Sequence, residues 1–110
     1  MKYGLPTDDD KTVGKVFGRA KSFAIYDNVD GSLTILANEG ANSEHGAGTG
    51  AVAFLVERGI DAVVAPELGP KATETLKAAG VRIESAKAGT VLGEAAAGIN
   101  NALGGESYPS

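Results

Sequence analysis

Residues 44–51, Glu-His-Gly-Ala-Gly-Thr-Gly-Ala, have the clearest capacity for binding chemistry in this chain. They include the only histidine, His45, and three glycines at alternate positions, Gly46, Gly48 and Gly50. Glycine lets the backbone approach a ligand closely. A helix that starts here would point its free N–H groups and the positive end of its dipole at the loop. The segment therefore predicts an anion-binding corner without naming the anion.

Several residues, in this corner and in segment 17–19, have both a binding and a structural interpretation. The His45 imidazole is a candidate metal ligand or donor to an anionic cluster, or else an exposed loop histidine, because one protein ligand rarely holds a metal. The three glycines could cradle an anion on backbone N–H groups, or only permit a tight loop. Arg19 could pair with an anion through its planar guanidinium, or form a surface salt bridge. Phe17 is expected to anchor its own loop, the one that carries Arg19, in the core.

Other chemistries find less support. Adjacent side chains rarely point to one place, so Asp8, Asp9 and Asp10 favour a solvated turn over a cation site. With a single histidine, no Ser-His-Asp set can be assembled, and the absence of cysteine removes disulfides, thiolate catalysis and cysteine-ligated clusters. The net charge of −4 and the lack of a basic stripe argue against nucleic-acid binding. No apolar run reaches the roughly 18 residues that span a membrane. No signal peptide is visible either, so a cytoplasmic protein is expected.

The first third of the chain is predicted to form three strands and a loop. The strands cover residues 3–5, which Pro6 is expected to stop, then 22–26 and 32–37, with a hairpin turn at Asp30-Gly31 between the last two. Residues 38–46 are polar and are expected to form a loop.

From Gly46 onward the apolar pattern predicts helices alternating with strands. The segment 51–56 is helical and ends near Gly59, residues 62–65 form a buried strand, and Pro70 opens a helix that Gly80 ends. Residues 81–84 form a half-buried strand, and Thr90 is the expected N-cap of a last helix that reaches residue 103. The predicted buried core comprises Val52, Leu55, Val63, Leu76, Ile83, Leu92 and Ile99.

The resulting order, β-β-β-α-β-α-β-α, predicts an α/β fold in which helices cover both faces of a mixed five-stranded sheet. The strands at 62–65 and 81–84 should be parallel. Sites in such sheets lie beyond the carboxyl ends of the parallel strands, where the loops 38–49, 66–70 and 85–90 could converge. We expect a single domain over residues 1–103 and a flexible tail over residues 104–110.

Six short pieces of the chain follow one another in a characteristic order. They are Phe17-Gly18-Arg19-Ala20, Glu44-His45-Gly46-Ala47-Gly48, Gly59-Ile60-Asp61-Ala62-Val63-Val64, Leu68-Gly69-Pro70-Lys71-Ala72, Leu76-Lys77-Ala78-Ala79-Gly80-Val81, and Gly89-Thr90-Val91 with Glu94-Ala95. In this order and spacing, over about residues 2–103, the chain resembles the dinitrogenase iron–molybdenum cofactor-binding family, the X- and Y-type cofactor carriers and their single-domain relatives.

The resemblance implies a ribonuclease-H-like fold and a non-enzymatic carrier of an iron–molybdenum or iron–sulfur type cofactor. Such a cargo would be bound transiently and exchanged with donor and acceptor proteins. The cofactor-binding residues that it implies are Phe17, Arg19, His45, Gly46, Gly48 and Gly50, with His45 as the metal ligand.

One position departs from the family pattern, which often reads His-Phe-Gly-Arg-Ala at the start of the first piece. Here Val16 replaces that histidine. With no cysteine in the chain, His45 is the only conventional soft ligand left. The alternative hypothesis is a small enzyme or regulatory domain that binds a phosphorylated or other anionic metabolite at the glycine-rich loop. A nuclease is disfavoured, because the first strand carries no acid and the first helix only Glu57.

Overall fold

The computed structural model describes residues 1–42 and 46–103. Its elements are, in order, β1 (Lys2–Thr7), β2 (Ser22–Asp27), β3 (Ser32–Ala37), the 3-10 turn η1 (Glu39–Asn42), α1 (Ala47–Val56), β4 (Ala62–Ala65), α2 (Pro70–Ala78), β5 (Arg82–Ser85) and α3 (Leu92–Leu103). The predicted order of strands and helices is confirmed. The segment expected to be only a loop, residues 38–46, contains η1. The predicted tail, residues 104–110, lies outside the described residues.

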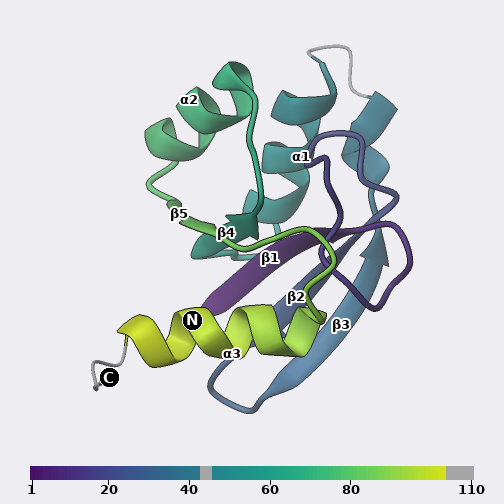
Figure 1. Cartoon of the computed structure of the whole chain (residues 1–110). Helices are drawn as coiled ribbons and strands as arrows, with labels where there is room; N and C mark the ends of the chain where they lie inside the picture. Colours follow the sequence, from purple (N-terminus) through teal and green to yellow (C-terminus); the bar gives the residue numbers. More distant parts are fainter. Residues whose placement is uncertain (43–45, 104–110) are drawn as a thin grey trace.

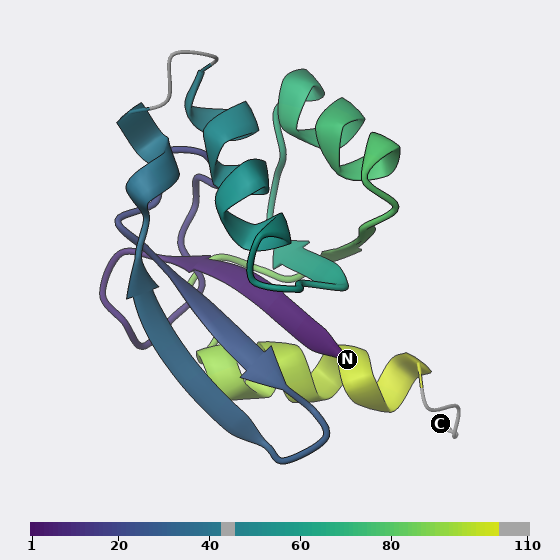
Figure 2. The same ribbon diagram turned by 180° about the vertical axis from the view of Figure 1, so that it is seen from behind.

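The strands form one mixed sheet in the order β3-β2-β1-β4-β5. β1 pairs antiparallel with β2, and β2 pairs antiparallel with β3. β4 is parallel to both β1 and β5, as predicted for the second half of the chain. Helices α1 and α2 cover one face of the sheet and α3 covers the other (Figures 1 and 2).

Each face of the sheet has its own hydrophobic core. On the α1 and α2 face, Leu55 and Leu76 pack with Phe23. On the α3 face, Leu92 packs with Tyr3 and Leu5. The predicted burial of one group is confirmed, namely Val52, Leu55, Val63, Leu76 and Leu92. The spacing of apolar residues along the chain therefore predicted buried residues on both faces of the sheet.

The predicted burial of Ile83 is wrong, because this residue is 36% exposed. β5 is an edge strand with β4 as its only neighbour, so its single apolar residue, Ile83, is covered from fewer sides than a residue of a central strand. Val56, which shares the predicted apolar spacing of α1, is 42% exposed at the end of that helix. The side chain of Ile99 lies outside the described part of the chain.

The prediction that Pro6 stops the first strand is also wrong. β1 continues to Thr7, and Pro6 pairs with Phe23 of β2. On the other side, β4 pairs only with Tyr3 and Gly4, so the missing N–H of Pro6 removes no bond to that strand. The Pro6 carbonyl instead accepts a hydrogen bond of 2.8 Å from the Gly14 N–H.

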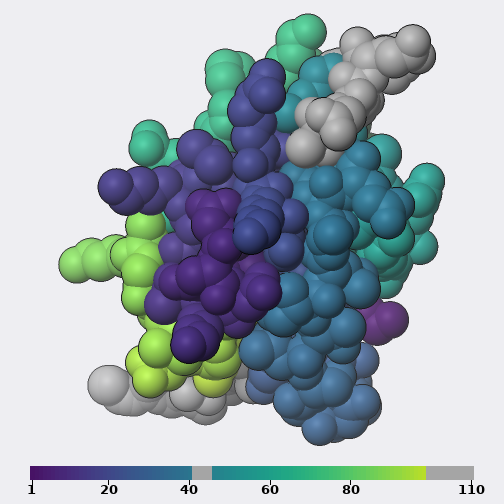
Figure 3. Space-filling model, turned by 90° about the vertical axis from the view of Figure 1, so that its right-hand side faces the viewer, coloured from purple at the N-terminus to yellow at the C-terminus, as the bar shows by residue number. Residues whose placement is uncertain are grey.

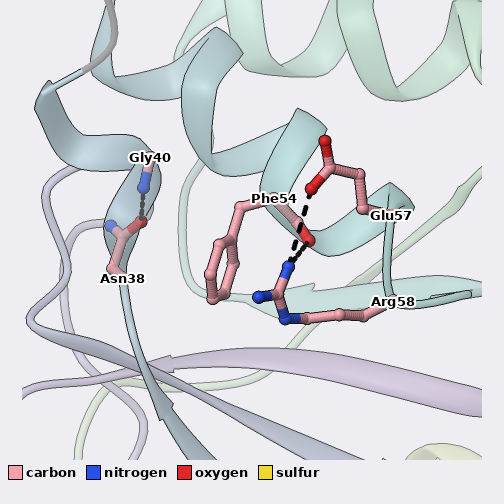
Figure 4. Close-up of polar contacts among 5 residues, drawn as sticks. All are labelled: Asn38, Gly40, Phe54, Glu57 and Arg58. Carbon is pink, nitrogen blue, oxygen red and sulfur yellow. Dashed lines mark hydrogen bonds and ion pairs between the residues drawn. The ribbon is translucent and has the colours of Figure 1, made fainter.

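The predicted helix ends at Gly59 and Gly80 agree with the structure, and both glycines have a φ of +76°. After α1, the Arg58 guanidinium lies 3.7 Å from the centroid of the Phe54 ring and donates a 2.8 Å hydrogen bond to the Phe54 carbonyl (Figure 4). Thr90 is not the N-cap of α3, because the helix begins at Leu92 and the Val91 carbonyl accepts the Ala95 N–H. No helix in the described part of the chain has the length and apolarity needed to cross a membrane.

Candidate functional site

A cavity of about 510 Å³ opens where three segments that are distant in the sequence meet. One wall is residues 15–19, which we call the Arg19 loop. The second wall is the start of α1, at Ala47 and Gly48, and the third is residues 67–72 around the start of α2. The Arg19 loop belongs to the connection between β1 and β2, and this N-terminal part of the chain is exposed between α2 and α3 in Figure 3. The cavity therefore depends on tertiary packing and not on one local motif.

Two helix N-termini border the cavity. α1 begins after Gly46, whose φ of +101° suits only glycine, and α2 begins after Gly69 with Pro70 in its first turn. Neither N-cap residue forms a side-chain hydrogen bond to the helix. The first-turn N–H groups therefore have no side-chain cap, and both helix dipoles add positive potential at the cavity.

The charged side chains at the cavity are mostly cationic. Lys15, Arg19 and Lys71 line it, together with the single carboxylate of Glu67. All four side chains are exposed. In the described ranges, 1–42 and 46–103, no ion pair involves any of the three cations. Their charges are therefore available to an anion that enters the cavity.

The Arg19 loop is held in place by its aromatic residue and its glycine. Phe17 is only 3% exposed, and its ring centroid lies 5.2 Å from that of Phe23, so it anchors the loop as expected. Gly18 meets the backbone of α1 at Gly48. Val16 is 51% exposed and lines the cavity. The position at which the family resemblance leads us to expect histidine is thus accessible from the cavity.

The structure brings only some of the predicted site residues together. Phe17, Arg19 and Gly48 line the same cavity, and Gly46 immediately precedes its second wall. Gly50 does not line it: this residue is buried, its N–H donates to the Gly46 carbonyl, and its backbone packs against Gly40. His45 lies outside the described residues.

Of the three loops expected to converge, the loop 85–90 does not reach this cavity. Gly89 donates a 2.8 Å hydrogen bond to the Val13 carbonyl, and Thr12 forms a bridge with Val91. Part of the β1–β2 connection therefore lies against this loop. Residues 8, 9 and 12–15 line a second pocket of about 360 Å³ with Ala88 and Gly89. The connection between β1 and β2 separates the two sites.

The acidic run at residues 8–10 shapes its own turn. The Asp9 carboxylate accepts hydrogen bonds from the N–H groups of Lys11 and Thr12 and from the Thr12 hydroxyl. These bonds, with the Thr12 N–H as the largest cause, hold the pKa of Asp9 far below its usual range. Asp8 accepts the Lys21 N–H at 3.0 Å. Within the described residues, no group of three or more histidine or carboxylate side chains could hold a metal ion.

Sequence reasoning did not assign Lys15, Lys71 or Glu67 to the site. A signal existed for Lys71, which directly follows Pro70 in the first turn of α2. A cation there interacts unfavourably with the positive end of the helix dipole, so no local interaction stabilises it. A lysine at such a helix start is consistent with an anionic ligand. Lys15 and Glu67 carry no comparable local signal.

Comparisons with known proteins agree with this fold. Residues 1–101 match the family described as "Dinitrogenase iron-molybdenum cofactor". The chain is 30% identical over 89 residues to an uncharacterized protein of Methanocaldococcus jannaschii. The aligned region covers 78% of this chain and 75% of that protein.

Two solved structures share the fold. The NMR structure of a putative NifB protein from Thermotoga, described as a DUF35 family member, has a TM-score of 0.71 and 31% identity, over 99% of this chain and 97% of that one. The apo form of the orange protein from Desulfovibrio gigas has a TM-score of 0.79 and 24% identity, over 99% of this chain and 92% of that one.

Proposed function

We propose that this chain, which belongs to the dinitrogenase iron–molybdenum cofactor family, is a non-enzymatic protein that binds and carries an anionic metal–sulfur cofactor. Its binding site is the cavity between the Arg19 loop and the starts of α1 and α2. The cofactor is cargo, held transiently and passed to other proteins. Family membership supports a role with cofactors of this kind. The cavity supports the location of the site.

The observation that carries the proposal is the convergence of three cations and two helix N-termini on one cavity. A hydrogen bond to a charged partner contributes about 1.5–3 kcal/mol, and each helix end contributes about 0.3–1 kcal/mol towards an anion. Lys15, Arg19 and Lys71 with the two helix starts can thus offset much of the desolvation cost of an anion. The Glu67 carboxylate opposes this and limits how negative a ligand the cavity favours.

The donor types at the cavity fit a cargo that already has its own metal ligands. The lining residues that the structure describes contain no cysteine, histidine, serine or threonine. They offer cationic side chains and backbone N–H groups, which bind the outer atoms of a cluster and not its metal ions. His45 directly precedes Gly46 in the sequence, and we propose it as the one residue able to add a metal–ligand bond.

The test uses tetrathiomolybdate, a coloured molybdenum–sulfur dianion, as the probe. The protein is incubated with it anaerobically, separated by gel filtration, and examined by absorption spectroscopy for bound molybdenum. Lys71→Gln should weaken binding by about tenfold, because it removes one charge-assisted contact. Lys77→Gln is the matched control: it makes the same change in the last turn of the same helix, away from the cavity.

Two results would overturn the proposal. One is wild-type protein that retains no probe. The other is equal weakening by Lys71→Gln and Lys77→Gln, which would indicate binding by overall charge. Inorganic phosphate is the competitor: if it binds and displaces the probe at equal concentration, the alternative of an anionic-metabolite site replaces the cofactor carrier.

A further inference from the structure

Asn38 makes an unusual set of contacts for a residue at the end of a strand. It directly follows β3, and its side-chain NH₂ group donates to the Gly18 carbonyl at 3.0 Å and to the Ala20 carbonyl at 2.9 Å. These two carbonyls flank Arg19 on either side in the chain. The Asn38 N–H also donates to the Lys21 carbonyl at 3.1 Å. One residue thus binds the backbone on both sides of the arginine at the cavity.

The remaining polar atom of the Asn38 side chain is used as well. Its Oδ1 accepts the Gly40 N–H at 3.0 Å (Figure 4). Gly40 is buried in η1, and its backbone lies so close to Gly50 and Ala51 of α1 that no β-carbon would fit. The side chain of Asn38 therefore connects the Arg19 loop to the segment that packs on α1.

Among residues 1–42 and 46–103, no side chain is paired with the Arg19 guanidinium to fix its position. Its side chain is exposed, and within the described residues it forms no ion pair. The loop around Arg19 also has no regular secondary structure, since β2 begins only at Ser22. The position of its guanidinium then depends on the backbone of the loop. Phe17 anchors that backbone before Arg19 and Asn38 anchors it on both sides.

We infer that Asn38 is a positioning residue for the anion site: it holds the Arg19 loop against the start of α1, so that Arg19 reaches the cavity without an ordering cost when the ligand binds. This inference rests on the proposed function. A preorganised site binds more tightly because less conformational freedom is lost on binding. Removing the two Asn38 donors should therefore weaken binding through Arg19, although Asn38 does not line the cavity.

The first experiment is a double-mutant cycle with tetrathiomolybdate as the probe. Asn38→Ala, Arg19→Gln and the double variant are compared with wild type. Asn38→Ala is expected to weaken binding by about tenfold in the wild-type background, as outer residues that orient ligand-binding groups do. In the Arg19→Gln background it should weaken binding by less than about twofold, because the group it positions is already gone. Equal effects in both backgrounds, or no effect, would overturn the inference.

The second experiment needs no ligand. Trypsin cleaves after arginine, so mass spectrometry can follow cleavage of the bond after Arg19. Asn38→Asp keeps the Oδ1 acceptor for Gly40 but places a carboxylate against the Gly18 and Ala20 carbonyls. It should speed cleavage after Arg19 by about tenfold or more, while cleavage after Arg82 in β5 stays at the wild-type rate. An unchanged rate after Arg19 would overturn the inference, and an equal rise at both bonds would show general unfolding instead.

A matched control separates the charge change from the position. Asn28→Asp makes the same substitution in the turn at the opposite end of β2, where the Asn28 Oδ1 accepts the N-terminal ammonium at 2.8 Å. It should leave both probe binding and cleavage after Arg19 unchanged. The two failures remain distinguishable. Loss of probe binding by wild type rejects the proposed function, whereas normal wild-type binding with an unaffected Asn38→Ala variant rejects only the role of Asn38.

Discussion

Gly18 and Gly48 meet backbone to backbone, since a β-carbon on Gly18 would lie 2.7 Å from the Gly48 nitrogen and 2.9 Å from its Cα. Gly18 belongs to the Arg19 loop, and Gly48 lies in the first turn of α1. These residues are far apart in the sequence, yet their contact closes one side of the cavity. The loop therefore lies this close to the start of α1 because Gly18 has no side chain, whereas a β-carbon on Gly48 would face Ala72 of α2 at 3.4 Å.

The first prediction follows from this contact. Gly18→Ala must displace the backbone of the loop or of α1, which should cost about 1–3 kcal/mol of unfolding free energy and weaken anion binding. Urea denaturation and probe binding measure the two effects. Gly93→Ala in α3 is the control: its added methyl group meets nothing within 4 Å, so stability should stay the same or rise slightly. Normal stability and binding in Gly18→Ala would contradict the close contact.

Arg19→Ala and His45→Ala are expected to weaken uptake of tetrathiomolybdate or of a reconstituted cluster without unfolding the protein. Arg19 is exposed and has no ion-pair partner among the described residues, so its removal should change the unfolding free energy by less than about 0.5 kcal/mol. Anaerobic gel filtration with absorption spectroscopy measures uptake. If both variants retain full uptake, binding rests on backbone groups alone or lies elsewhere.

Val16→His should increase the retention of a metal–sulfur probe. Val16 is 51% exposed at the cavity, so an imidazole there would be accessible to a ligand and could donate or coordinate. The measurement is the fraction of molybdenum that stays with the protein after gel filtration. Val16→Ala controls for the loss of the valine side chain. Equal retention by wild type and both variants would remove the reason for treating this departure from the family pattern as functional.

Leu55→Ala tests the core that supports α1. Leu55 is completely buried in the hydrophobic core between α1 and the sheet, so its truncation should cost about 2–5 kcal/mol. The neighbouring Val56 is 42% exposed, and Val56→Ala should cost less than about 0.5 kcal/mol. Chemical denaturation compares the two. Similar costs for both variants would mean that the buried face of α1 is assigned wrongly.

The stability of the protein should fall at alkaline pH because of Tyr3. Burial raises the pKa of Tyr3 above its ordinary value of 10.0. The unfolded state therefore loses this proton first, so the unfolding free energy should be constant up to about pH 9 and decline above about pH 10. Urea denaturation across this range measures it. Tyr3→Phe should flatten the decline, and an equally steep decline in that variant would assign the effect to another group.

Much of the fold can be predicted from short stretches of sequence. The apolar run at residues 62–65, the proline at position 70 and the glycines at positions 59 and 80 each have a local physical meaning, and each element appears in the structure. Predictions from local sequence were wrong where the pairing of neighbouring strands determines the structure. Pro6 is tolerated because of where β4 stops pairing, and Ile83 is exposed because β5 is an edge strand.

The candidate site, too, could be predicted only in part from the sequence. Residue types and spacing singled out Gly46 and Gly48, because backbone freedom and a helix start are local properties, and the family resemblance with the charge of Arg19 added that residue. Only the tertiary structure joined them to Lys15 and Lys71, and only it showed that Asn38 binds the carbonyls on both sides of Arg19. The reason is the strand order: β1 lies between β2 and β4, so the connection before β2 and the loop after β4 meet at the start of α1. That order results from side-chain packing between distant segments, which periodicity within one segment does not encode.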